Sequence, residues 1–265
     1  MFVLQANPTI LHRVAVVELF GTIGGQIKSN QYEHIFTNIA KNDRMRALVL
    51  DIDSPGGGVS ASDYLYRSVL KVAERKPVIA CIRGLGASGA YYISCAANKI
   101  IATPGAIIGS IGVISVRPAL QELLERIGVG VVVNKSGPYK DMGAFWREAT
   151  DEEQGKMQEL IDESYDTFVS IVAKGRNMDE AKVREVATGE VFWATKAKEL
   201  DLIDELGDLE MAIEMAADMA GAPPKPVFIR PRRGLRQMLM NPASALVESL
   251  ADEIETRIRL GFTRY

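Results

Sequence analysis

Residues 47–63 read ALVLDIDSPGGGVSASD, and this stretch decides the fold class. Its first part, residues 47–52, is an apolar run of strand length. Three glycines at 56–58 follow it, and apolar residues then recur at helical spacing from 65 to 72. The stretch therefore predicts a buried strand, a glycine turn and a helix.

The same unit recurs on both sides of this stretch. RVAVVELF at 13–20 is a β-branched apolar run that ends at glycines, and PVIACI at 77–82 leads into a glycine turn and a run of small and aromatic residues through 97. Two further apolar runs, at 99–102 and 130–134, predict strands with a short helix between them. Repeated strand, turn and helix is typical of a parallel sheet in an α/β protein.

Helical patterns dominate the second half of the chain. A capping box at Thr150 and Glu153 predicts the start of a long amphipathic helix, which Gly175 is expected to end. Shorter helical patterns follow before a proline-rich stretch. We therefore expect one α/β domain over residues 1–222 and a C-terminal extension with an amphipathic helix over residues 223–265.

The composition is that of an ordinary globular protein. The 265 residues are 47% hydrophobic and 25% charged, with a formal net charge of −3, which does not indicate nucleic-acid binding. Cys81 and Cys95 are the only cysteines, and they lack the C-x-x-C spacing of zinc and redox sites. We expect both to be buried bystanders and predict no metal site.

The sequence predicts no membrane span. The longest uncharged stretch, residues 100–116, contains Pro104 and three glycines, which would break a lipid-exposed helix. The N-terminus lacks the basic start and the long apolar core of a secretion signal. The chain as given is expected to be soluble and cytoplasmic, or membrane-associated if an N-terminal anchor has been removed.

Ser88 is the candidate nucleophile. It lies between Gly86 and Gly89, where a predicted strand meets a predicted helix, so backbone N–H groups can lie beside its hydroxyl. Such donors stabilise the oxyanion that forms when a nucleophile attacks a carbonyl. The second glycine is one place nearer than in the G-x-S-x-G elbow, which disfavours an α/β-hydrolase.

A serine hydroxyl needs an adjacent base, either a histidine or a lysine kept neutral by burial. His12 and His34 are the only histidines and lie far upstream of Ser88, which disfavours a Ser-His-Asp triad without excluding it. A lysine can serve only when desolvation lowers its pKa. The loop PYKDMGAF at 138–145 offers apolar neighbours of this kind for Lys140.

The glycine turn DSPGGGV at 53–59 has two interpretations. Consecutive glycines let backbone amides approach a ligand closely at the carboxyl end of a strand, and they also suit a tight structural turn. The G-x-x-x-x-G-K-[ST] pattern of a phosphate-binding loop is absent, so nucleotide binding is disfavoured.

Four motifs occur in one order along the chain: DSPGGGV at 53–59, GASGAYYISCAA at 86–97, GSIGVI at 109–114 and SGPYKDMG at 136–143. This order resembles that of the signal peptide peptidase A family, the S49 serine peptidases. The resemblance extends through G-x-V-F at 189–192 and L-I-D at 202–204. It covers most of the chain before the proline-rich stretch.

The resemblance implies a ClpP/crotonase-like α/β fold of stacked ββα units, with a helical C-terminal region. It also implies a Ser-Lys dyad. Matched by motif, Ser88 is the nucleophile, Lys140 is the general base, and Ser110 hydrogen-bonds and orients the lysine.

The oxyanion donors implied by the resemblance are the N–H groups of Gly57 and Gly89, with Gly56 as the alternative to Gly57. The implied substrates are remnant signal peptides or other unstructured hydrophobic segments, cleaved without a cofactor. Family members can share the serine and the lysine between neighbouring protomers of a ring. The implied assembly is therefore a homo-oligomer whose active sites are shared.

Two other functions are compatible with the sequence. A crotonase-type acyl-CoA enzyme would use the same amides on a thioester enolate, without a nucleophilic serine. A catalytically idle scaffold or partner-binding ring would keep the fold alone. The presence of Ser88, Ser110 and Lys140 together favours the peptidase.

Overall fold

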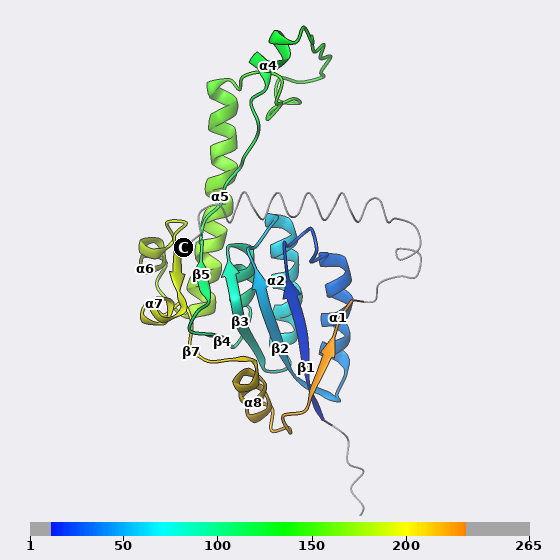
Figure 1. The fold of residues 1–265 in the computed structure, drawn as a ribbon, viewed down its shortest axis with the longest axis vertical. Helices are drawn as coiled ribbons and strands as arrows, with labels where there is room; N and C mark the ends of the chain where they lie inside the picture. The colour runs from blue at the N-terminus through cyan, green and yellow to red at the C-terminus, as the bar shows by residue number, and fades with distance from the viewer. Residues whose placement is uncertain (1–11, 232–265) are drawn as a thin grey trace, which may run out of the picture. The chain divides into compact units, whose positions relative to one another are not determined.

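The computed structural model describes residues 12–231, which form an eight-stranded sheet with helices on both faces (Figure 1). The strands are β1 (Arg13–Phe20), β2 (Met45–Ser54), β3 (Val78–Ala87), β4 (Lys99–Ala102), β5 (Ile107–Gly109), β6 (Val191–Trp193), β7 (Glu205–Leu206) and β8 (Pro226–Ile229). The helices are α1 (Ser29–Lys41), α2 (Val59–Ala73), α3 (Gly89–Ser94), α4 (Gln121–Arg126), α5 (Asp151–Arg176), α6 (Glu180–Val186), α7 (Ala194–Glu199) and α8 (Leu209–Met219).

The sheet is parallel along most of its width, as the repeated strand-turn-helix units predict. In the order β6-β5-β3-β2-β1-β8, each neighbouring pair is parallel except β5 with β6. β4 pairs with the middle of β3 and with β7, whereas β5 pairs with Leu85–Ala87 at the end of β3. The carboxyl end of β3 therefore lies between β2 and β5.

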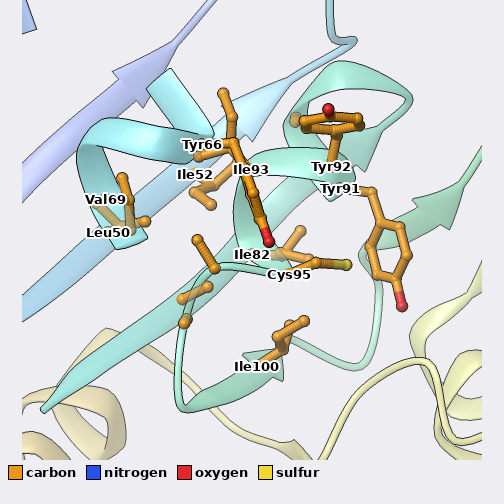
Figure 2. Packing of buried hydrophobic residues seen from close by; sticks show 14 of the residues in the cluster. Leu50, Ile52, Tyr66, Val69, Ile82, Tyr91, Tyr92, Ile93, Cys95 and Ile100 are labelled. Atoms are coloured by element: carbon orange, nitrogen blue, oxygen red, sulfur yellow. The ribbon is translucent and has the colours of Figure 1, made fainter. Parts of the chain in front are cut away.

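Alternate residues of the central strands pack against different helical layers. Leu50 and Ile52 of β2 belong to the main core with α1, α2 and α3, whereas Val49 packs with α8 on the other face. Figure 2 shows part of the main core, including Val69 of α2 and Ile93 of α3. Each fully buried aliphatic side chain stabilises the fold by about 1.5–3 kcal/mol. This core fixes the carboxyl ends of β2 and β3.

The predicted capping box at the start of α5 is confirmed. The Glu153 N–H donates to Thr150 Oγ1 at 3.2 Å, and the Thr150 N–H donates to the Glu153 carboxylate at 3.0 Å. The predicted cap at Gly175 is wrong, because the left-handed C-cap is Asn177, with φ 52°. A Cβ at Gly175 would lie 2.4 Å from the carbonyl oxygen of Cys95. Gly175 therefore allows α5 to pack closely on the end of α3.

Two segments differ from their sequence predictions. Residues 130–134, predicted as a strand, form no regular structure, and Val132 is 89% exposed. No other part of the described chain pairs with them. β8 was not predicted, since it begins at Pro226 within the proline-rich stretch. Its proline is tolerated because it is the first residue of a strand at the edge of the sheet.

The chain divides into two units, one ending at Ile229 and the other beginning at Arg230. β8 belongs to the first unit. The domain boundary after residue 222 stays a prediction, and the amphipathic helix predicted for the C-terminal extension lies outside the described residues. Within residues 12–231, every helix is too short or too polar to cross a membrane.

Candidate active site

Ser88 lies at the joint between β3 and α3. It is the N-cap of α3 and adopts φ 52° and ψ −122°, a conformation that residues with a side chain rarely adopt. Its N–H donates to the carbonyl oxygen of Gly109 at 2.8 Å, and its own carbonyl oxygen accepts from the Tyr92 N–H at 2.9 Å. Strain of this kind persists only where the surroundings hold it, and it is concentrated at functional sites.

The glycine turn after β2 lies against this joint. A Cβ at Gly56 would lie 2.6 Å from the amide nitrogen of Gly89. A Cβ at Gly89 would lie 3.3 Å from the amide nitrogen of Gly57 and 2.2 Å from Ser62 Oγ. The two motifs are rich in glycine because their backbones meet here with no room for side chains.

Two backbone N–H groups at this contact have no acceptor among the described residues. The Gly56 N–H donates to Ser54 Oγ at 3.1 Å, and the Gly58 N–H donates to a carbonyl oxygen of an adjacent turn at 3.1 Å. Between residues 12 and 231, no acceptor is present for the N–H groups of Gly57 and Gly89. Gly57, rather than Gly56, therefore has a free donor next to Gly89.

Ser110 lies close to Ser88 because β3 and β5 end together. Ala87 pairs with Gly109, so Ser88 and Ser110 each follow directly on a paired residue. Ser110 has φ 50°, is half-buried, and donates its N–H to the carbonyl oxygen of Glu190 at 2.7 Å. The structure therefore brings these two predicted site residues to the ends of neighbouring strands.

A small pocket of about 30 Å³ lies at Ser88. Its other lining residues are Gly57, Val59, Ser62, Gly89, Tyr92, Gly112, Val113, Ser164 and Phe168. Ser62 was not singled out from the sequence, although its hydroxyl donates to the carbonyl oxygen of Gly58 at 3.0 Å and so braces the glycine turn. Ser164 and Phe168 belong to α5, and only tertiary packing brings that helix to Ser88.

Lys140 lies apart from this pocket. Its side chain is exposed, and the preceding residue, Tyr139, donates its hydroxyl to the carboxylate of Glu152 in the first turn of α5. The Ser88 pocket meets α5 at Ser164, which is 12 residues later and therefore about 18 Å further along the helix. Figure 1 shows the chain leaving β5 and reaching α4 beyond the N-terminal end of α5. A single copy does not bring Lys140 to Ser88.

Neither histidine supplies an alternative base in one copy. His12 precedes the amino end of β1, whereas Ser88 follows the carboxyl end of the parallel strand β3. β1 alone has eight residues and spans about 26 Å. His34 is exposed on α1 and does not line the Ser88 pocket. This placement disfavours the Ser-His-Asp alternative.

Comparison with known proteins indicates the fold and the family. The family model described as Clp protease matches residues 11–108, and the one described as Peptidase family S49 matches residues 71–222. A solved structure of a mutant of the 1510-N membrane-bound stomatin-specific protease has a TM-score of 0.52 and 18% identity, covering 83% of this chain and 99% of that one. The predicted ClpP-like α/β fold is confirmed.

Closer sequence relatives carry peptidase names. The Synechocystis sp. protein slr0021, described as a candidate protease, is 41% identical, covering 81% of this chain and 77% of its own length. An Enterococcus faecium protein described as a candidate signal peptide peptidase SppA is 34% identical, covering 76% of this chain and 62% of its own. The chain therefore belongs to the S49 peptidases, the signal peptide peptidase A family.

Proposed function

We propose that this chain is a serine endopeptidase in which Ser88 is the nucleophile and Lys140 of a second copy is the general base. One observation carries the proposal: Ser88 is held in a strained turn beside the free N–H groups of Gly57 and Gly89. A nucleophile next to oxyanion donors suits acyl transfer. Membership of a peptidase family supports the peptide bond as the target.

The position of Lys140 supports a shared active site. In one copy, Lys140 lies beside the first turn of α5, whereas Ser88 lies beside a later part of the same helix. A neighbouring copy would therefore have to supply the base. The segment that carries Lys140 also exposes large apolar side chains, among them Ile114, Val116 and Val132, which are 85%, 84% and 89% exposed. Several large exposed apolar side chains on one segment favour an interaction surface there. A homo-oligomer, such as a ring, would cover it.

The proposed reaction has two steps. Neutral Lys140 accepts the Ser88 hydroxyl proton as Oγ bonds to the scissile carbonyl carbon, and the N–H groups of Gly57 and Gly89 bind the oxyanion. The C–N bond then breaks, and Lys140 gives the proton to the leaving amine. Water attacks the acyl-enzyme in the second step, passing a proton through Lys140 back to Ser88. Ser110 orients the lysine amine by a hydrogen bond.

The proposed substrates are remnant signal peptides or other unstructured hydrophobic segments. The pocket at Ser88 is narrow and has apolar walls at Val59, Val113 and Phe168. An extended segment can lie across its opening and present a backbone carbonyl to the amides, whereas a folded surface cannot approach them as closely. Apolar walls favour apolar side chains beside the cleaved bond.

The test is cleavage of an unstructured hydrophobic peptide by the full chain, compared with Ser88→Ala and Lys140→Ala proteins of the same oligomeric state. We expect cleavage by the wild type and its loss in both variants. Cleavage that persists in Ser88→Ala would overturn the assignment of the nucleophile. An inactive wild type with intact assembly would favour the scaffold alternative.

A further inference from the structure

A charged cluster joins the Lys140 loop to the first turn of α5. Arg147 donates to both carboxylate oxygens of Asp141 at 2.9 Å and to Glu153 Oε2 at 2.8 Å, with a further bond to Glu153 Oε1. Lys135 donates to Asp141 Oδ1 at 2.7 Å. One guanidinium therefore bridges the residue after Lys140 and the N3 residue of α5 through two bidentate contacts.

The cluster is largely removed from water. The side chains of Asp141 and Glu153 are only 9% and 4% exposed, and that of Arg147 is 28% exposed. The Arg147 guanidinium, aided by the Thr150 N–H, lowers the pKa of Glu153 to about 2. Hydrogen bonds from Arg147 and then Lys135 hold the pKa of Asp141 below its ordinary value. Both carboxylates are therefore charged at neutral pH, and both bind the same arginine.

The side chains on either side of Lys140 are anchored, whereas the side chain of Lys140 has no such anchor among the described residues. Tyr139 donates to Glu152, and the Lys156 ammonium lies 4.8 Å from the centre of its ring. On the other side, Asp141 is held by Arg147. Within the described part of the chain, the Lys140 side-chain nitrogen has no ion pair or hydrogen-bond partner, and the side chain is exposed. The loop thus presents one free lysine between two fixed neighbours.

We propose that Arg147 is a positioning residue for Lys140, holding the Lys140 loop on α5 so that its amine points towards Ser88 of the neighbouring copy. This inference rests on the proposed function. Arg147 does not touch the substrate; it acts through Asp141 and the backbone that Asp141 shares with Lys140. An arginine is needed because a planar guanidinium can bind two carboxylates in a bidentate way, which an ammonium cannot.

The experiment uses the full chain with Arg147→Met, Arg147→Lys and, as the matched control, Arg184→Met. Arg184 pairs with Asp166 in the second half of α5, and both side chains of that pair are well exposed. We expect Arg147→Met to lower kcat on the order of 10²-fold with little change in KM, because a small misplacement of a catalytic group has that effect. The kcat of Arg147→Lys should lie between those of Arg147→Met and the wild type, and the kcat of Arg184→Met should match that of the wild type. Guanidinium added to the solution should restore part of the kcat of Arg147→Met.

A second arm asks whether Arg147 acts through the lysine. The rate at which an activated ester acylates Ser88 is measured in Lys140→Ala and in the double variant Lys140→Ala with Arg147→Met. A positioning role predicts that Arg147→Met causes no further loss once Lys140 is absent. If the two losses multiply, Arg147 acts independently and the proposal is wrong.

The remaining outcomes separate this inference from the proposed function. If Lys140→Ala is inactive and Arg147→Met is fully active, the proposed dyad stands and the positioning role is overturned. A fully active Lys140→Ala overturns both. Loss of the oligomer in Arg147→Met and in Arg147→Lys would assign Arg147 to assembly and overturn the positioning role. Thermal unfolding and sedimentation of each variant provide these controls.

Discussion

The N–H of Ser88 donates to the carbonyl oxygen of Gly109, and this 2.8 Å bond ties the proposed nucleophile to the end of β5. Ser110, the residue proposed to orient the base, is the next residue along the chain. The paired ends of β3 and β5 therefore hold both serines, whereas Lys140 lies in a separate segment that contacts the first turn of α5. This division leads to the first prediction.

Mixing two inactive variants should restore activity if the site is shared. A Ser88→Ala copy supplies an intact Lys140, and a Lys140→Ala copy supplies an intact Ser88. After subunit exchange at equal concentrations, about a quarter of the interfaces should combine both intact residues, by simple probability for identical subunits. Peptide cleavage by the mixture, compared with each variant alone, measures this. A mixture that stays inactive after exchange shows that each site is built from one copy.

Gly57→Ala should strongly reduce turnover. A Cβ at position 57 would lie 2.0 Å from the carbonyl oxygen of Ile23, so the turn has to move and the Gly57 N–H loses its place. Removing an oxyanion donor lowers kcat on the order of 10²–10³-fold. Steady-state cleavage rates at saturating peptide provide the measurement.

Gly58→Ala is the matched control for that variant. Gly58 has φ −62°, and a Cβ there would have no heavy atom within 4 Å. We expect turnover and stability close to those of the wild type. Equal losses at positions 57 and 58 would argue against a specific role for the Gly57 N–H.

Asp204→Asn should destabilise the fold. Arg176, only 8% exposed, donates to Asp204 at 2.7 Å, and the Ile100 N–H donates to the same carboxylate at 2.8 Å. Removing the charge of one partner leaves a buried arginine uncompensated, which costs about 3–5 kcal/mol. Urea unfolding measures the change. Asp166→Asn, which removes an exposed pair, should change the free energy of unfolding by less than about 1 kcal/mol.

The Asp204 carboxylate should also make the stability of the fold depend on pH. Desolvation alone would raise the pKa of Asp204, but hydrogen bonds from Arg176, Ile100 and Lys99 outweigh it and lower the pKa below the ordinary 3.8. The contribution of Asp204 to the free energy of unfolding is therefore complete well above pH 3.8, and it is lost as the pH falls through the lowered pKa. The stability difference between the wild type and Asp204→Asn should narrow on acidification below 3.8, and a constant difference would contradict the pairing.

The two thiols should be inert in the native protein. Both cysteines are buried, and desolvation raises the pKa of Cys81 and that of Cys95 to about 12. Since the thiolate is the reactive form, alkylating reagents at neutral pH should label neither residue and leave peptidase activity unchanged. Mass spectrometry of native and urea-unfolded protein measures labelling. Inactivation by a thiol reagent without unfolding would point to a different nucleophile.

Local chemistry made much of the fold predictable. The apolar run at 13–20 became β1 with the same bounds, because a β-branched segment that glycines end has few other stable arrangements. The Thr150 capping box marked the first turn of α5, since its hydrogen bonds are local. The valines at 130–134 have strand propensity too, but a strand needs a partner, and none is present in residues 12–231.

By itself, the sequence determined which residues are candidates for the proposed chemistry: its motifs marked the two serines, the lysine and the glycines proposed for the site. Only the tertiary structure decided which of them meet. Hydrogen bonding between β3 and β5 brings Ser88 to Ser110, and backbone contact without side chains brings Gly57 to Gly89. The length of α5 keeps Lys140 away from them. Such distances depend on how strands pair and helices pack, which are long-range interactions that no local motif encodes.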